Sequence, residues 1–201
     1  MRVHLIRHGE TNWNKEKRVQ GHSESTLTPQ GQQQARELAP MLRQHPITKI
    51  YCSSSIRTRQ TCELLFSSDP IETLYNDDLR EIYLGPWEGK LQSEIRSLYP
   101  EQFENFFHAP DQFAQAEAET FEEVQQRGLK LLKQILSDDS AQEVAIVSHG
   151  VLIKSLLCHL ENRPLAQLWE PPIMHNCAHS IIATETTSSA PRIIQFAGIA
   201  Q

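Results

Sequence analysis

The sequence lacks the features that would tie the chain to a membrane or to nucleic acid. None of its 201 residues belongs to a run approaching the roughly 18 apolar residues that a membrane-spanning helix needs. The start, residues 1–5, lacks the long apolar stretch of a signal peptide. Lys and Arg number 19 against 25 Asp and Glu, a formal net charge of -6, so there is no global basic field. We therefore expect neither a nucleic-acid nor a membrane partner.

Cysteine is also scarce and lacks metal-binding or redox spacing. The four cysteines show no C-x-x-C pair, and we expect them to be reduced, buried thiols in a cytoplasmic protein: Cys52, Cys62, Cys158 and Cys177. No internal repeat divides the chain. Its length and its 39% hydrophobic content are ordinary for one globular domain, which we predict to span residues 1–201.

Strand-like and helix-like segments alternate along the chain. Short apolar runs predict strands at residues 2–6, 47–52, 71–74, 143–147, 180–183 and 192–196. Helices are predicted after Thr28-Pro29, from about Ser55, from Thr120 and after Gly150, with Pro40 kinking or ending the first of them. This order predicts an α/β fold, a three-layer α/β/α sandwich with a mostly parallel sheet and an antiparallel edge strand.

Residues 77–120 are the least periodic part of the chain, and three prolines interrupt them. We expect them to form an excursion, or lid, over the active site. Phe103, Phe106 and Phe107 have helical spacing and would pack a helix there.

Two histidines stand at the ends of two predicted strands, and each precedes a glycine. His8 follows the first strand in Arg7-His8-Gly9, and His149 follows a later strand in Ser148-His149-Gly150. The carboxyl ends of parallel strands meet at the edge where open α/β sheets bind ligands. We therefore expect the two histidines to lie together in a binding site.

The residue types near this edge suit phosphoryl transfer. Neutral imidazole is a good nucleophile near pH 7, and His8 is placed for that role. Arg7, Arg57 at a helix start, and His149 could converge on one phosphate, with Asn14 as a neutral donor. No local histidine spacing indicates a metal site: His4 is expected to be structural, and His22, His108, His175 and His179 lack partners.

Several separated blocks together resemble the histidine phosphatase superfamily, which includes the cofactor-dependent phosphoglycerate mutases. The blocks occur in the family's order and cover most of the chain: residues 5–14, 20–21, 27–31, 52–61, 79–82, 85–89 and 148–150. The resemblance implies that His8 is phosphorylated and that Glu81 donates a proton to the leaving oxygen. Arg7, Asn14, Arg57 and His149 would bind the phosphoryl group, and His149 would also take part in catalysis.

The resemblance further implies that Gln20 and Gly21 line the substrate entrance and that no metal or other cofactor is required. It places Asn176 and His179 near the edge of the site. The substrate would be a small phosphorylated metabolite. A homodimer is left open.

The mid-chain segment favours a phosphatase over a mutase. Mutases of this family carry adjacent arginines there, whereas residues 88–127 contain only Lys90, Arg96 and Arg127 as cations. Glu81 precedes Ile82-Tyr83, where mutases place a basic residue. We therefore predict a metal-independent phosphomonoester hydrolase of histidine acid type, broad in specificity or acting on a small metabolite. The alternatives are a phosphoglycerate mutase and a catalytically inactive module that binds phosphorylated ligands.

Overall fold

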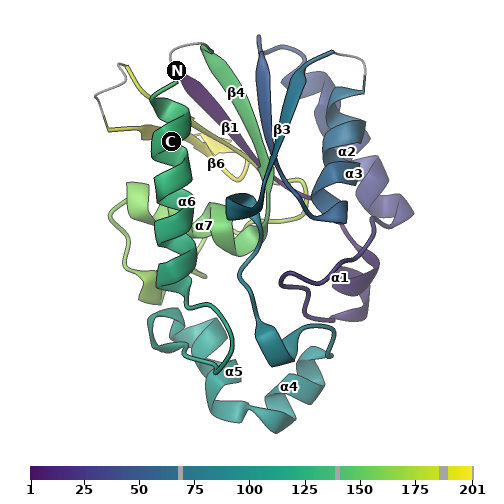
Figure 1. Ribbon diagram of the computed structural model, residues 1–201, viewed down its shortest axis with the longest axis vertical. Helices are drawn as coiled ribbons and strands as arrows, with labels where there is room; N and C mark the ends of the chain where they lie inside the picture. Colours follow the sequence, from purple (N-terminus) through teal and green to yellow (C-terminus); the bar gives the residue numbers. More distant parts are fainter. Residues whose placement is uncertain (68–69, 139–140, 186–189, 201) are drawn as a thin grey trace.

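A computed structural model describes residues 1–67, 70–138, 141–185 and 190–200. They form a seven-stranded sheet in the order β3-β2-β4-β1-β5-β6-β7 (Figure 1). These strands are, in that order, Glu72–Asn76, Lys49–Ser53, Glu143–Ser148, Arg2–Arg7, His179–Ala183, Arg192–Phe196 and Ile199–Ala200. The first four are parallel, and β5, β6 and β7 pair antiparallel. The predicted mostly parallel sheet with an antiparallel edge is confirmed, although the short β7 was not predicted.

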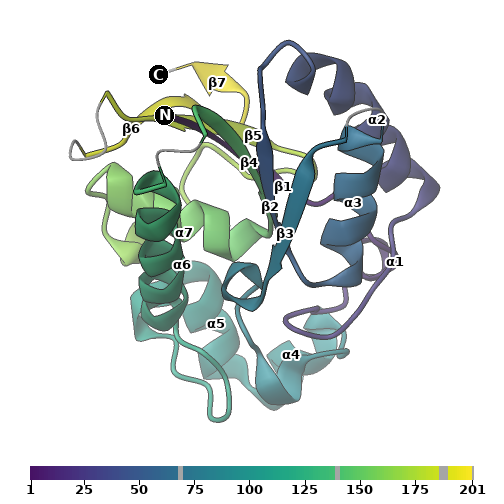
Figure 2. The same cartoon turned by 45° about the horizontal axis from the view of Figure 1, so that its top comes forward.

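Helices cover both faces of the sheet, as Figures 1 and 2 show. On one face lie α2 (Pro29–Leu42) and α3 (Ile56–Phe66), and on the other α6 (Phe121–Leu136) and α7 (Gly150–Leu160). Successive strand residues serve opposite faces: Leu5 packs with the α6–α7 side and Ile6 with the α2–α3 side. The central strands are therefore buried on both sides, as parallel strands in a sandwich must be.

Local sequence explains the helix ends. Thr28 caps α2 by accepting the Gly31 N–H at 3.0 Å, and Thr120 and Glu123 form the predicted capping box of α6. Pro40 does not end α2, which runs two residues further to Leu42. The proline lies in the last turn, where only one helical hydrogen bond is lost and the helix is about to stop.

Residues 77–120 cross the carboxyl end of the sheet as short helices. They include α4 (Gln92–Leu98), α5 (Pro100–His108) and three 3₁₀ helices at Asp77–Leu79, Gly85–Trp87 and Pro110–Gln112. In Figure 1, α4 and α5 lie at the opposite end of the molecule from the N-terminus, below α6. Aromatic rings join this excursion to the core, with Phe106 at 5.0 Å from Phe121 and 5.6 Å from Trp169 between ring centroids.

Two remaining elements are α1 (Asn12–Glu16) and a 3₁₀ helix at Leu165–Gln167. Among the described residues, no helix has both the length and the apolar character needed to cross a bilayer. All four cysteines are free thiols; three are buried as predicted, and Cys177 is partly exposed.

Candidate active site

The two histidines of the predicted site do lie together. β1 and β4 are parallel neighbours with Arg7 opposite Ser148, so the chain leaves both strands at the same edge. The backbone N–H of His8 donates to the Ser148 carbonyl at 3.0 Å, and the centroids of the His8 and His149 rings are 5.3 Å apart. The edge of the sheet thus places the imidazoles side by side, as the sequence predicted.

The backbone fixes the tautomer of His8. Its Nδ1 lies 2.8 Å from the Gly9 carbonyl oxygen, which can only accept, so Nδ1 carries the proton and Nε2 presents a lone pair. Burial lowers the pKa of His8 well below 6.5, and the nearby Arg57 and Arg7 lower it further. The ring is therefore neutral at pH 7, the form that a nucleophile needs.

Arg57 is a fully buried guanidinium at the start of α3. Its Nε donates to Nδ1 of His149 at 3.2 Å, and its two terminal nitrogens donate to the carbonyls of Ser23 (2.9 Å) and Gly21 (2.7 Å). A guanidinium has five N–H groups, so two remain for a phosphoryl oxygen. Burial lowers the pKa of Arg57 to about 10, which leaves it charged at neutral pH.

His149 is held from both sides. Because Nδ1 accepts from Arg57, the neutral ring carries its proton on Nε2, which lies 2.8 Å from the hydroxyl of Ser53. Burial lowers the pKa of His149 well below 6.5, with Arg57 and His8 adding to the effect. Sequence reasoning missed Ser53; its position at the end of a strand neighbouring β4 was the available signal.

Arg7 offers an unpaired donor at the site. Its Nη1 donates to the Met174 carbonyl. Its Nε is buried without a hydrogen-bond partner in the described part of the chain. Gly150 lies against it: a Cβ there would be 3.4 Å from that Nε, an ordinary contact distance. A buried unsatisfied donor is costly and favours an anion as its partner.

Glu81 sits against the start of α7. Its carboxylate oxygens accept the backbone N–H groups of Val151 at 3.2 Å and Leu152 at 3.3 Å, and that of Ile82 at 3.1 Å. The positive end of the helix dipole points at this side chain. The carboxyl group is therefore oriented by the element that follows His149.

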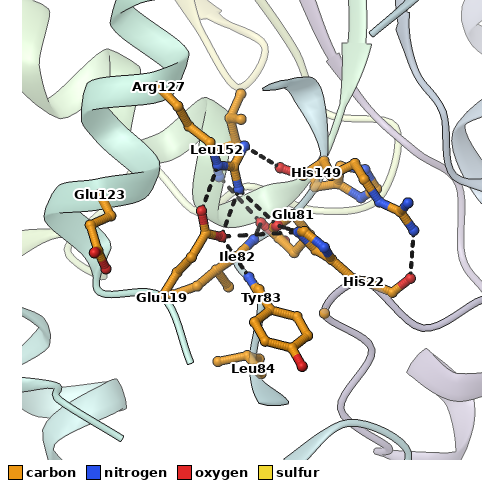
Figure 3. A network of polar contacts seen from close by, with 12 residues as sticks. His22, Glu81, Ile82, Tyr83, Leu84, Glu119, Glu123, Arg127, His149 and Leu152 are labelled. Atoms are coloured by element: carbon orange, nitrogen blue, oxygen red, sulfur yellow. Dashed lines mark hydrogen bonds and ion pairs between the residues drawn. The ribbon is translucent and has the colours of Figure 1, made fainter. Parts of the chain in front are cut away.

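Arg127 on α6 clamps the segment that carries Glu81 (Figure 3). Its terminal nitrogens donate to the carbonyls of Asp78 (2.8 Å), Arg80 (2.8 Å) and Glu81 (2.9 Å). Its Nε and Nη2 also bind both carboxylate oxygens of Glu119, at 2.8 and 3.0 Å. Sequence reasoning counted Arg127 only as a mid-chain cation; its place among apolar positions of an amphipathic helix was the signal for a buried role.

The loop at Gln20 and Gly21 is shaped by Glu88. Gly21 has φ of +55°, and a Cβ there would lie 2.1 Å from Oε1 of Glu88. That carboxylate accepts the backbone N–H of His22 at 2.8 Å and the hydroxyl of Ser23 at 2.7 Å. Gly21 is thus required for both backbone conformation and space. Glu88 was not predicted to have this role.

Asn14 takes part in the capping box of its own helix and contacts Asn176, which in turn contacts His8. Its Oδ1 accepts from the Thr11 backbone at 3.1 Å and from Nδ2 of Asn176 at 3.3 Å. Asn176 also donates to the His8 carbonyl at 3.3 Å, as expected of a residue near the site edge. His179 does not face the site; its ring lies 3.0 Å from the ring of His4, within the sheet.

A cavity of about 300 Å³ opens beside these groups. Arg7, Gln20, Gly21 and Glu81 line its polar part. Gln92, Gly150 and Lys154 also line it, and the rest is apolar: Val19, Ile82, Leu84, Phe106, Phe107, Val151, Trp169, Ile173 and Met174. His8, Arg57 and His149 are buried next to these residues rather than lining the cavity. The arrangement suits a phosphate ester with its anion at the polar end and an apolar group at the other.

Comparison with known proteins assigns the family. The model of the histidine phosphatase superfamily (branch 1) matches residues 3–195. The chain therefore belongs to this superfamily. It is 30% identical over 181 residues to Phosphoserine phosphatase 1 of Hydrogenobacter thermophilus, covering 90% of this chain and 85% of that protein.

Mutase names also occur among the relatives. The chain is 30% identical over 155 residues to Phosphoglycerate mutase-like protein 4 of Arabidopsis thaliana, covering 76% of this chain and 67% of that protein. Among solved structures, Bacillus stearothermophilus YhfR superposes with a TM-score of 0.94 at 36% identity, over 100% of this chain and 98% of that one. The predicted family and fold are confirmed.

Proposed function

Because the chain belongs to the histidine phosphatase superfamily, we propose that it hydrolyses phosphomonoesters through a phosphohistidine formed on His8. One observation carries the proposal. The hydrogen bond from Nδ1 to the Gly9 carbonyl leaves Nε2 of His8 as a lone pair, next to two guanidinium groups. A neutral imidazole held beside fixed positive charge is suited to attack the phosphorus of an anionic ester.

The proposed reaction has two displacements. Nε2 of His8 attacks phosphorus, an N–P bond forms, the ester P–O bond breaks, and the protonated Glu81 carboxyl gives its proton to the leaving oxygen. Water then attacks the phosphohistidine while the Glu81 carboxylate takes a proton from it. The N–P bond breaks, and inorganic phosphate and free His8 are restored. Glu81 thus acts as acid and then as base.

The remaining residues would stabilise the negative charge of the phosphoryl group. The unpaired Nε of Arg7 and the two remaining N–H groups of Arg57 would donate to the phosphoryl oxygens, with Asn14 as a neutral donor. His149 would donate to the same group after exchanging its bond to Ser53. Two guanidiniums supply the positive charge that a metal supplies elsewhere, so we propose a metal-independent reaction.

The cavity favours hydrolysis over mutase chemistry. A mutase must clamp a second acidic group of its substrate, but beyond Arg7 the described residues lining the cavity include one cation, Lys154, among mostly apolar and aromatic side chains. Lys154 is buried and donates to the carbonyls of Glu170 and Pro172. We therefore propose small phosphorylated metabolites with an apolar leaving group, rather than phosphoglycerates, as substrates.

The test is chemical trapping of the intermediate. Rapid quench of the protein with an aryl phosphate should give an acid-labile, base-stable phosphoryl adduct on one histidine. His8→Ala should abolish both turnover and adduct, whereas His108→Ala, an exposed histidine on α5, should change neither. An adduct that persists in His8→Ala would assign the nucleophile to another residue.

A further inference from the structure

A second group of histidines lies within the sheet, away from the proposed active site. His4 is in β1, four residues or about 13 Å of strand before His8. Its side chain is fully buried and faces the α2–α3 side. Around it gather Glu143 at the start of β4 and His45 in the connection from α2 to β2, at the end of the sheet where the chain begins (marked N in Figure 2).

We propose that His4, His45 and Glu143 bind a divalent transition-metal cation, with Zn²⁺ the best match. Oε2 of Glu143 is 3.1 Å from Nε2 of His4 and 3.2 Å from Nδ1 of His45. All three ligand atoms lie within 4.8 Å of one another. A four-coordinate ion bonded at about 2.0–2.1 Å needs ligand atoms roughly 3.3–3.4 Å apart. Two of the three separations are thus close to that value before any ion is bound.

The ligand types also agree with this class of cation. Two imidazole nitrogens and one carboxylate oxygen suit Zn²⁺ and its neighbours better than Mg²⁺ or Ca²⁺, which prefer oxygen ligands. Three protein ligands leave the fourth position to water. His45 is half-buried and lines a surface cavity of about 510 Å³, which gives an ion a route to the cluster.

Outer groups are in place to orient the ligands. Nδ1 of His4 lies 3.0 Å from Nε2 of His179, so a proton on Nδ1 can be donated to that ring while Nε2 faces the cation. Each ligand imidazole keeps one proton, on the nitrogen that does not bind the ion. Nη1 of Arg2 is 3.2 Å from Oε1 of Glu143, which leaves Oε2 to the ion.

The charge of Arg2 opposes a cation but does so weakly. The Arg2 side chain is 56% exposed, so water and salt screen it, and it can move away at little cost. A bound ion would join β1 and β4 to the α2–β2 connection, and its role would be to stabilise the fold. No spacing in the sequence indicates the cluster, because its three residues are far apart in the chain.

Calorimetric titration of the full chain with ZnCl₂, after chelator treatment and dialysis, tests the proposal. The wild type should bind one Zn²⁺ with a tight first site. His45→Ala and Glu143→Gln should weaken that site roughly 100-fold or more, beyond the 10–100-fold typical of an outer partner. His108→Ala is the matched control and should bind as the wild type does. His45 is partly exposed and Glu143→Gln keeps the side-chain shape, so both variants should fold.

Two further readouts separate this site from weak surface binding. Free Zn²⁺ at 100 times Kd should raise the wild-type Tm by roughly 5–10 °C, and His45→Ala should lose that rise. Co²⁺ should give the visible absorption of a four-coordinate ion in the wild type but not in His45→Ala. Failure of Zn²⁺ to bind, or equal binding by the wild type and both variants, would show that the cluster is a hydrogen-bonded network only.

Discussion

Replacing Arg127 by methionine should loosen the segment that carries Glu81 and destabilise the fold. The guanidinium donates to three backbone carbonyls of residues 78–81 and to both carboxylate oxygens of Glu119. Methionine fills similar space but donates nothing, so the Asp78 and Arg80 carbonyls lose this donor, while the Glu81 carbonyl keeps its contact with Nε2 of His22. The Glu119 carboxylate keeps the Tyr83 N–H but loses its ion-pair partner. The two side chains are only 17% and 23% exposed, so water replaces these contacts incompletely.

The expected cost follows from the burial of this pair. Breaking a buried ion pair costs about 3–5 kcal/mol, and partial exposure reduces that to about 2–4 kcal/mol here. For a domain of this size the Tm should fall by roughly 5–15 °C. Displacement of Glu81 by an ångström would cost up to about 10²-fold in the rate of the step that uses it as an acid.

Three variants separate stability from positioning. Urea unfolding and single-turnover kinetics on an alkyl phosphate would be measured for Arg127→Met, for Arg127→Met/Glu119→Gln, and for Arg96→Met. The double variant should regain part of the stability, since the orphaned charge is gone, but not the rate. Arg96 pairs with Glu104 where both side chains are more than half exposed, so its loss should cost under about 1 kcal/mol.

The stability that the Arg127–Glu119 pair contributes should depend on pH. Burial raises the pKa of Glu119, but hydrogen bonds from Arg127 and the Tyr83 backbone outweigh it and leave the pKa below 4.5. A carboxyl with a lowered folded-state pKa contributes stability above its unfolded value, and this is lost as pH falls through the folded value. The stability gap between wild type and Arg127→Met should therefore be full at pH 7 and shrink below about pH 4.5. A Tm and an alkyl phosphate rate both equal to wild type would refute this account of Arg127.

Three other predictions concern the chemistry. Glu81→Gln should slow phosphorylation of the enzyme by alkyl phosphates ~10²-fold or more in single-turnover experiments. Aryl phosphates should be slowed much less, because good leaving groups need no acid. Equal slowing of both substrates would show that Glu81 is not the acid. EDTA should leave the initial rate unchanged well below the Tm, since an ion bound by His4, His45 and Glu143 would not touch His8; loss of rate restored by Mg²⁺ would overturn the metal-independent mechanism. The protein should release inorganic phosphate from an aryl phosphate and interconvert 2- and 3-phosphoglycerate little; efficient interconversion without phosphate release would favour the mutase alternative.

The fold was largely predictable because its signals are local. Apolar runs, the Thr28 and Thr120 caps and the alternation of strands with helices each act over a few residues. Pro40 was predicted to kink or end its helix; the second alternative was wrong, because proline costs little in a last turn. β7 was missed because two residues carry no periodic pattern.

The site was predictable only in part, because its outer groups depend on tertiary contacts. His8, His149 and Arg57 follow strands or begin a helix, and the structure brings them together. Ser53, Glu88 and Arg127 support the site from three different segments. The strand end of Ser53 and the apolar helix positions around Arg127 are local signals, but neither identifies the groups that these side chains contact. The same reason hid the cluster of His4, His45 and Glu143, whose members meet only once β1, β4 and the α2–β2 connection are assembled.

The position of β1 sets the order in which the protein can be completed during synthesis. Its two neighbours in the sheet are β4 and β5, so the strand that leads to His8 has no partner until residues 143–148 exist, and it lacks its second until residues 179–183 exist. At about 5–20 residues per second, the ribosome needs roughly 9–35 s to pass from residue 8 to residue 183. Contacts between segments so far apart in the sequence are also slow to form. The strand that leads to the nucleophile is thus made well before it is fixed in the sheet, and protease resistance of ribosome-stalled chains should arise only after β5 has emerged.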